Sequence, residues 1–255
     1  LRDDFNFGSV VLYDCKAFRD ACSRMDEEYR YAGHYDLRLK ISQKYSLIHI
    51  QELLYTEVET DTRKTGEKQF DYVDPRNRAV QAEMEKACTH HLKCIGGWLP
   101  PGFRDVSFDD NGFEYDASVV IPVRNRVKTI GDAIRSVLGQ KTKYRFNLIV
   151  VDNYSTDGTT EIISSFAGDS RLVHIIPDRK DLGIGGCWNE AVFSESCGRF
   201  AIQLDSDDLY IDDTVVTRIV DAFHEQHCAM VVGSYRMVNF DLDEIPPGLI
   251  DHREW

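Results

Sequence analysis

The run Asp205-Ser206-Asp207-Asp208 follows a short apolar stretch, and its residue types could bind a metal ion. Side chains alternate along a strand, so Asp205 and Asp207 would face the same side where that strand ends. Two adjacent carboxylates repel each other unless positive charge lies between them, and hard divalent cations prefer oxygen ligands. An acidic run can also cap the helix that follows it. The spacing therefore predicts either a metal site with Asp205 and Asp207 as ligands or a capping turn.

Three other polar loops follow predicted strands in the same part of the chain. Pro122-Val123-Arg124-Asn125 follows the first strand, Asp152-Asn153-Tyr154-Ser155 the second, and the segment from Asp181 to Gly186 the third. In open α/β sheets, ligands bind beyond the carboxyl ends of the strands. Since all four loops share that edge, we expect them to line one crevice.

The elements that would position these loops are an alternation of short apolar runs and amphipathic segments from residue 115 onward. This alternation is typical of an α/β fold with a mostly parallel sheet and flanking helices. The expected strands are Ser118–Pro122, Phe146–Asp152, Leu172–Ile176, Phe200–Asp205 and Met230–Ser234. Helices are expected from Ile130 to Leu138, from near Thr159, from Gly185 to Ser194 and after Asp213.

The chain is predicted to contain two units. Residues 98–116 lack periodicity and read as a linker, which leaves a smaller α+β unit at 1–97 and the α/β unit at 117–255. The predicted elements of the first unit are strands Ser9–Tyr13 and Leu47–Tyr55 and helices Lys16–Arg24, Tyr35–Lys44 and Asn77–Cys94. Cys88, His90, His91 and Cys94 suggest zinc, but on one helix they would point around most of its circumference.

Composition narrows the class of protein. The net charge of −13 disfavours nucleic acid and anionic lipid as partners, and the 42% hydrophobic content is that of an ordinary globular protein. The longest apolar runs fall far short of the ~20 residues that span a bilayer. The start LRDDFNFG lacks signal-peptide features, and seven cysteines without paired spacing favour free thiols in a reducing compartment. We therefore expect a cytoplasmic location, including the inner face of the membrane.

The four loops, taken in order, resemble those of the family 2 glycosyltransferases of the GT-A fold, which transfer sugars from nucleotide diphosphates. VVIPVRN is similar to the family's first strand and nucleotide loop, and VVDNYSTDGT to its second. DLGIGGCWNEA is similar to its Gly-rich segment, and LDSDD to its DxD motif. Two positions depart from the pattern, because Asn153 stands where Asp is usual and Trp188 where Arg is frequent.

This resemblance implies a metal-dependent, inverting glycosyltransferase of polysaccharide or glycan assembly, with a UDP-sugar as the favoured donor and a saccharide or other hydroxyl as acceptor. Mn²⁺ or Mg²⁺ would be held by Asp207 together with Asp205, and Asp205 would also lie near the ribose. The remaining implied contacts to the nucleotide are Pro122, Arg124, Asn125, Asp152 at the base, and Asp181, Gly183, Gly186 and Asn189 along the cleft.

Residues 5–60 resemble the later, acceptor-side half of the same fold. Many relatives carry G-E-D-x-D-L there, and the Asp after Glu is the catalytic base. In this sequence, Gly33 and His34 stand at the positions of the Glu and the first Asp, and Asp36 stands at the position of the second Asp. His34 and Asp36 are therefore catalytic candidates, or simply residues at the start of a solvated helix. Because an acceptor-side half precedes a donor-side half, the sequence suggests part of a tandem two-transferase protein or a permuted unit.

Two other functions stay open on sequence alone. A degenerate, non-catalytic module of this type would bind a nucleotide or a partner without turnover. A sugar nucleotidyltransferase shares the α/β layers but has a Gly-rich phosphate loop after its first strand, and IPVRNRVK contains no glycine.

Overall fold

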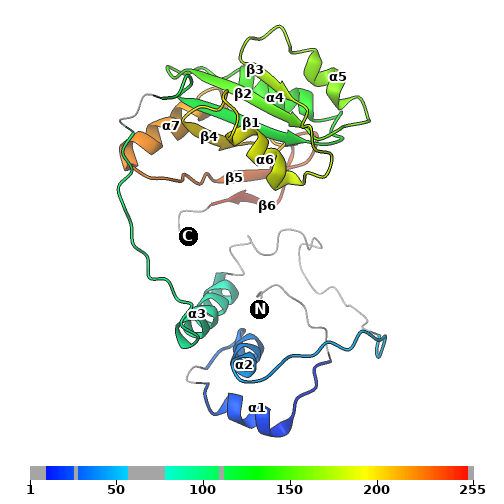
Figure 1. The fold of residues 1–255 in the computed structure, drawn as a ribbon, viewed down its shortest axis with the longest axis vertical. Coiled ribbons are helices and arrows are strands. Elements are labelled where there is room, and N and C mark those ends of the chain that lie inside the picture. Colours follow the sequence, from blue (N-terminus) through cyan, green and yellow to red (C-terminus); the bar gives the residue numbers. More distant parts are fainter. Residues whose placement is uncertain (1–9, 26–27, 57–77, 109–111, 252–255) are drawn as a thin grey trace. The chain divides into compact units, whose positions relative to one another are not determined.

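The computed structural model describes residues 10–25, 28–56, 78–108 and 112–251 (Figure 1). The chain divides into two compact units: the first unit consists of residues 1–102 with 232–255, and the second unit of residues 103–231. The predicted functional division at residues 98–116 stays a prediction. The helices are α1 Cys15–Cys22, α2 Gly33–Ser42, α3 Arg78–Cys94, α4 Ile130–Leu138, α5 Thr159–Ser164, α6 Ile184–Val192 and α7 Val215–Gln226. The strands are β1 Ala117–Val123, β2 Phe146–Asp152, β3 Leu172–Ile175, β4 Phe200–Gln203, β5 Tyr235–Val238 and β6 Glu244–Ile250.

Strands β1 to β4 form one parallel sheet in the order β3-β2-β1-β4. β1 and β2 pair from Ala117 with Phe146 to Val123 with Asp152, and every residue of both strands is buried. Near-continuous apolar runs are what the inner strands of a parallel sheet require, since helices cover both of its faces. The predicted α/β class with a mostly parallel sheet is confirmed.

Alternate residues of the inner strands pack on opposite faces of the sheet. Val119 and Ile121 of β1 belong to the larger core, with apolar residues of α4, α5 and α7. Val120 and Ile149 belong to the opposite core, with Cys187 of α6. Figure 1 shows α6 crossing the sheet on the side opposite α4.

Four of the predicted strands in the second unit are confirmed as β1 to β4, although β3 and β4 end earlier, at Ile175 and Gln203. The predicted helices there are confirmed as α4, α5, α6 and α7. The predicted strand Met230–Ser234 is wrong, because this stretch has no regular structure and β5 begins only at Tyr235. Met230 is 75% exposed, so its apolar side chain has no sheet face to cover. β5 instead pairs antiparallel with β6.

In the first unit, α2 packs against both of the other helices. Tyr35 and Leu39 cluster with Ala87 of α3, while Leu37 and Ile41 cluster with Ala21 of α1. All three predicted helices are confirmed, with Asn77 outside the described residues. α3 is one continuous helix, and the described part of the chain contains no cluster of three or more His, Cys, Asp or Glu side chains placed to bind one metal ion.

The two strands predicted for the first unit are wrong where the structure describes them. Residues 10–13 and 47–55 carry no strand, and Ser9 lies outside the described residues. Ile48 is 86% and Leu53 is 95% exposed. A strand exists only when another backbone pairs with it and one face is covered, and an alternating sequence supplies neither.

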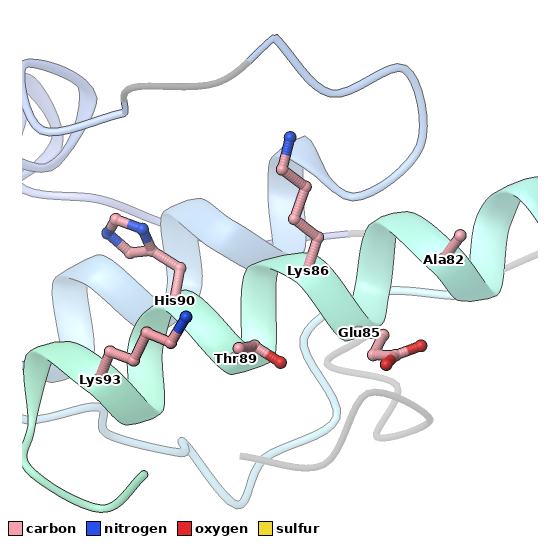
Figure 2. A pocket seen from close by; sticks show the side chains of 6 residues that line it. All are labelled: Ala82, Glu85, Lys86, Thr89, His90 and Lys93. Carbon is pink, nitrogen blue, oxygen red and sulfur yellow. The ribbon is translucent and has the colours of Figure 1, made fainter. Parts of the chain in front are cut away.

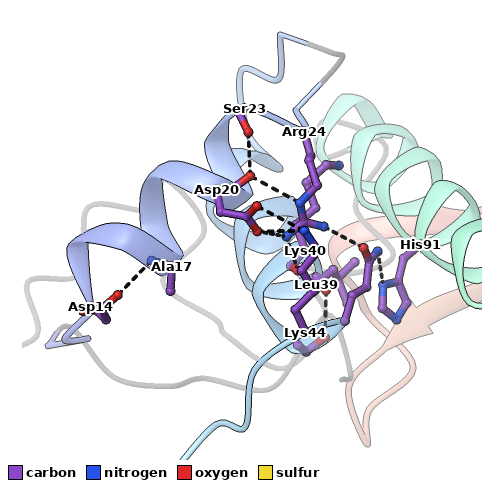
Figure 3. A network of polar contacts seen from close by, with 11 residues as sticks. Asp14, Ala17, Asp20, Ser23, Arg24, Leu39, Lys40, Lys44 and His91 are labelled. Atoms are coloured by element: carbon purple, nitrogen blue, oxygen red, sulfur yellow. Dashed lines mark hydrogen bonds and ion pairs between the residues drawn. The ribbon is translucent and has the colours of Figure 1, made fainter.

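A polar network joins α1, α2 and α3 (Figure 3). The guanidinium of Arg24 donates to the side chain of Gln43 at 2.8 Å and to the carbonyl of Lys40 at 2.8 Å, and it pairs with Asp20 at 3.2 Å. Gln43 Nε2 in turn lies 3.2 Å from Nδ1 of buried His91. Burial of this imidazole, followed by the charge of Lys40, lowers the pKa of His91. The three helices are thus fixed by polar contacts as well as by apolar packing.

The amino end of α2 is satisfied from α3 rather than by its own cap residue. The carboxylate of Glu83 accepts the backbone N–H groups of Tyr31 at 2.7 Å, Ala32 at 3.0 Å and Arg30 at 3.2 Å. These bonds lower the pKa of Glu83, and the bond from Tyr31 has the largest effect.

Within the described ranges, every helix is too short or too polar to cross a lipid bilayer.

Candidate functional site

The loops that the sequence nominates all leave the same edge of the sheet. The ends of β1 and β2 lie side by side, because Val123 pairs with Asp152. β4 stops at the level of Val120, and Leu204 continues its direction by donating to the Val120 carbonyl at 3.2 Å. Asp205 therefore follows at the same edge. Pro122 is buried near the end of β1, beyond the last residue pair between β1 and β4.

The loops after β1 and β2 are bonded to each other. Asn125 N donates to Ser155 Oγ at 2.9 Å, and Asn125 Oδ1 accepts from Thr156 N at 2.8 Å. Val127 N donates to Asp157 of the second loop as well, and Arg126 N donates to Thr159 at the start of α5. Asn125 adopts a φ of 55°, a left-handed conformation that Asn tolerates better than most residues. The two loops thus form one prearranged surface.

Asp152 is 1% exposed, and both of its oxygens accept hydrogen bonds. Ser155 N donates to Oδ1 at 3.0 Å and Thr160 Oγ1 to Oδ2 at 2.5 Å, while His174 Nε2 lies 3.8 Å from Oδ2. Recognition of a base by Asp152 stays a prediction, and the bonds in the structure give this carboxylate a role in shaping its loop. The neighbouring Asn153 is also buried, and its Oδ1 has no hydrogen-bond partner within the described part of the chain.

Three carboxylates gather where β4 ends. Ser206 is buried and the side chain of Asp207 is 47% exposed. Residues 205–208 form a turn, in which Asp208 N donates to the Asp205 carbonyl at 3.1 Å, so the strand alternation expected from the sequence does not extend to Asp207. Arg126 Nε, from the loop after β1, lies 3.7 Å from Asp207 Oδ2. Partial desolvation raises the pKa of Asp208, and the negative charges of Asp205 and Asp207 raise it further. Among the described residues, the ion pair made by this group of carboxylates is that of Asp207 with Arg126, so negative charge is in excess here.

This donor set fits a hard divalent cation that a ligand helps to bind. The available atoms are carboxylate oxygens, which suit Mg²⁺ or Mn²⁺, and Mg²⁺ is usually bound by one or two carboxylates together with phosphate oxygens. Such a site needs no cage of three protein ligands, and the described residues contain none. Asp205 and Asp207 would be the protein's ligands, with Gln203 Nε2 donating to Asp205 Oδ1 at 3.2 Å.

The Gly-rich segment leads into α6. Gly183 is the residue that precedes the helix, and a Cβ on Gly186 would come within 2.8 Å of Leu182 Cδ2, so close packing accounts for that glycine. Asp181 is exposed and forms a two-bond ion pair with Arg179, at 3.0 and 2.8 Å. Asn189 is exposed on α6, and Trp188, on the same helix, packs against the core.

The catalytic candidates of the first unit have different surroundings. His34 is exposed, whereas Asp36 is 1% exposed and accepts two bonds from Lys40 Nζ, at 2.7 and 2.8 Å. A catalytic role for either residue stays a prediction. A separate hollow of about 420 Å³ lies along α3 and is lined by Ala82, Glu85, Lys86, Thr89, His90 and Lys93 (Figure 2). None of the nominated site residues line it.

The residues that arrange the loops lie outside the candidates named from the sequence. Asp157 accepts from Val127 N at 3.1 Å and from Thr159 Oγ1 at 2.6 Å, and the bond from Thr159 is the main cause of its lowered pKa. Thr160 closes the loop onto Asp152. The Ser, Thr and Asp residues of YSTDGTT are a sequence signal for this arrangement, because such side chains commonly bond to nearby backbone.

Comparisons with known proteins find similar glycosyltransferases. A glucosyltransferase of Escherichia coli, UDP-Glc:alpha-D-GlcNAc-diphosphoundecaprenol beta-1,3-glucosyltransferase WfgD, is 32% identical over 126 residues, 49% of this chain and 48% of that protein. Glycosyltransferase GlyG of Streptococcus pneumoniae is 27% identical over 124 residues, 49% of this chain and 40% of that protein. The match thus spans about half the length of these relatives or less.

Among solved structures, S. aureus TarS 1-349 in complex with UDP-GlcNAc shares 28% identity over 44% of this chain and 32% of that chain, with a TM-score of 0.39. The profile of glycosyl transferase family 2 matches residues 118–254, which include the whole parallel sheet except its first residue and all four loops at its edge. The match covers more than half of the sequence, and the chain belongs to glycosyl transferase family 2.

Proposed function

We propose that this chain binds a nucleotide-diphosphate sugar at the carboxyl edge of β1 to β4 and serves the transfer of that sugar to a hydroxyl acceptor. The observation that carries the proposal is the meeting of Arg126, from the loop after β1, with Asp207, after β4, at 3.7 Å. It brings a cation and a group of carboxylates together at the edge where α/β sheets bind ligands.

The acidic and the basic residues at this edge would have different roles. Asp207, half exposed, and Asp205 supply oxygen atoms for Mn²⁺ or Mg²⁺. When bound, the ion would neutralise the charge that develops on the leaving diphosphate. Arg126 and the exposed Arg124 supply positive charge from the β1 side. Asn125, fixed between the two loops, orients its neighbours rather than moving on binding.

Family membership and one relative support the choice of substrates. The name of WfgD states a UDP-glucose donor and a lipid-linked diphosphate acceptor. On this basis we favour a UDP-sugar as donor, a saccharide acceptor in polysaccharide or glycan assembly, and inversion at the transferred carbon. Free cysteines throughout the described residues and a lipid-linked acceptor would both fit a cytoplasmic site at the inner face of the membrane.

Calorimetric titration tests the donor site. UDP and GDP are titrated, with and without Mn²⁺, into the wild type and Asp207→Ala, with Asp213→Ala as control. Asp213 is also an acidic residue paired with a cation, since Lys141 Nζ lies 2.7 Å from its carboxylate, but it lies just before α7. We expect Mn²⁺-dependent UDP binding that Asp207→Ala abolishes and Asp213→Ala keeps. Wild-type protein that binds neither nucleotide would contradict the proposal.

A second candidate function is binding without turnover, which the buried pairing of Asp36 with Lys40 favours. A carboxylate that is 1% exposed, with both oxygens bound to a lysine, is out of reach of an acceptor hydroxyl while that pair holds. Release of UDP from a UDP-sugar by this chain would exclude the second candidate. Tight UDP binding without release would favour it, and would fit a chain whose catalytic base lies in another part of a tandem protein.

A further inference from the structure

Tyr154 occupies a backbone conformation that large side chains rarely adopt. Its φ is 56°, in the left-handed region. A bulky residue stays in such a conformation only where its surroundings hold it there. The contacts of this side chain therefore indicate what it is retained for.

The Tyr154 side chain reaches the segment that links β3 to α6. Its hydroxyl donates to the carbonyl oxygen of Pro177 and lies 3.3 Å from that of Asp178. Lys180 Nζ lies 5.2 Å from the centre of the ring, within range of a cation–π contact. The adjacent Asn153 donates from Nδ2 to the Leu182 carbonyl at 2.6 Å. Two successive residues after β2 thus hold both ends of segment 177–182.

That segment sets the position of the Gly-rich entry to α6. It carries Asp181, and Leu182 packs so closely on Gly186 that a Cβ there would lie 2.8 Å from Leu182 Cδ2. Segment 177–182 has no helix or strand of its own. Its internal ion pair, Arg179 with Asp181, joins two exposed side chains and does not attach the segment to the sheet.

We propose that Tyr154 is a positioning residue, which holds segment 177–182 against the β2 loop before the donor nucleotide arrives. This inference rests on the proposed function, since the segment is taken to line the nucleotide cleft. A loop that is already ordered does not have to lose conformational freedom on binding, so preorganisation raises affinity. The tyrosine acts through the carbonyls of Pro177 and Asp178 and does not touch the reacting atoms.

Tyr154→Phe removes only the hydroxyl, and Tyr154→Gly removes the side chain and the strain together. Hydrogen exchange of the amides at 178–183 reports on the loop without any ligand, and calorimetry reports UDP affinity with Mn²⁺. For Tyr154→Phe we expect severalfold faster exchange at 178–183 and a Kd for UDP raised about three- to tenfold, as for one lost hydrogen bond. Tyr154→Gly should show at least as large an increase in exchange. In turnover, KM should rise while kcat is kept.

Tyr144→Phe is the matched control, because the Tyr144 hydroxyl also donates a hydrogen bond, to Asp221 of α7 at 2.6 Å. It should leave both exchange at 178–183 and UDP affinity unchanged. The inference would be overturned if the wild type binds UDP and Tyr154→Phe shows the same UDP affinity and the same exchange at 178–183 as the wild type. Wild-type protein that fails to bind UDP would contradict the proposed function instead, and exchange alone would then show whether Tyr154 holds the segment.

Discussion

Lys40 Nζ lies 2.7 Å from Asp36 Oδ1 and 2.8 Å from Asp36 Oδ2, and the two side chains are 5% and 1% exposed. Both residues lie on α2, one helical turn apart, and α2 is covered by α1 and α3. The carboxylate that sequence resemblance nominates for proton transfer is therefore half of a buried ion pair. Its first expected contribution is to stability.

Removing one partner of this pair should destabilise the first unit strongly. Asp36→Asn leaves the lysine charge buried without compensation, which typically costs about 3–5 kcal/mol. Replacing both residues, as Asp36→Leu with Lys40→Met, should recover most of that loss, because neither charge is then buried. Urea unfolding followed by helix signal in circular dichroism measures the difference.

Lys44→Met is the matched control for this prediction. Lys44 also pairs with an aspartate, Asp20 at 3.1 Å, but its side chain is 49% exposed. A solvent-exposed pair contributes about 1 kcal/mol or less. Equal losses for Asp36→Asn and Lys44→Met would show that burial does not distinguish the two pairs.

Stability of the first unit should fall in acid because of Glu83. Its pKa in the folded protein is below the ordinary value of 4.5, since the carboxylate accepts N–H groups of Tyr31, Ala32 and Arg30. The stabilisation is present above the unfolded pKa and is lost as pH falls through the lower, folded pKa. Glu83→Gln should therefore show a smaller loss of unfolding free energy between pH 5 and pH 3, a range of about one unit either side of the usual carboxyl pKa.

Glu85→Gln provides the comparison on the same helix. Glu85 lines the open hollow along α3 rather than the amino end of α2 (Figure 2). The unfolding free energy of Glu85→Gln should change between pH 5 and pH 3 as that of the wild type does. If Glu83→Gln also follows the wild type, the bonds to α2 do not depend on the charge of Glu83.

The sequence predicts best those helices and strands whose structure follows from the pattern of their own residues. β1 and β2 are runs of apolar residues buried on both faces, and α4 and α7 have one apolar side, so local patterns suffice. The errors at Leu47–Tyr55 and Met230–Ser234 have the opposite cause. Those stretches have strand-like composition, but a strand needs a backbone neighbour that composition does not specify.

For the candidate site, the sequence predicts which loops meet but not how side chains are used. Parallel topology brings the residues after β1, β2 and β4 to one edge, as expected from their order. The occupied oxygens of Asp152 and the reach of Tyr154 to Pro177 depend on distances across the fold. The spacing of Asp36 and Lys40 suggests an ion pair, but only the packing of α1 and α3 shows that it is buried.

Gly198, just before β4, should not tolerate a side chain. A Cβ there would lie 2.8 Å from the Ala117 carbonyl carbon and 2.9 Å from the Tyr115 oxygen, and backbone atoms cannot move aside cheaply. Gly198→Ala should cost about 1–3 kcal/mol, as overpacking does. Gly185→Ala, on α6 with open space around the added atom, should be neutral or stabilise by up to about 1 kcal/mol. Comparable losses in urea unfolding for both variants would contradict this argument.

Neutralising Asp208 should stabilise the ligand-free protein. Desolvation, with the charges of Asp205 and Asp207, raises its pKa in the folded state above the ordinary value of 3.8. A raised carboxyl pKa contributes stability that is full below the unfolded pKa and is lost as pH rises through the folded pKa. At neutral pH the ionised group therefore opposes folding. In EDTA at pH 7, Asp208→Asn should raise the Tm and flatten its dependence on pH.

Asp213→Asn should act in the opposite direction, because Asp213 lies 2.7 Å from Lys141 Nζ and raises the pKa of that lysine. The Tm of Asp213→Asn at pH 7 should be equal to that of the wild type or lower. Added Mn²⁺ should raise the Tm of the wild type more than that of Asp208→Asn, since a bound cation relieves the repulsion that the substitution has already removed. A Tm for Asp208→Asn that falls as far as that of Asp213→Asn would mean that the carboxylates after β4 do not repel one another, and the electrostatic argument for a cation between them would fail.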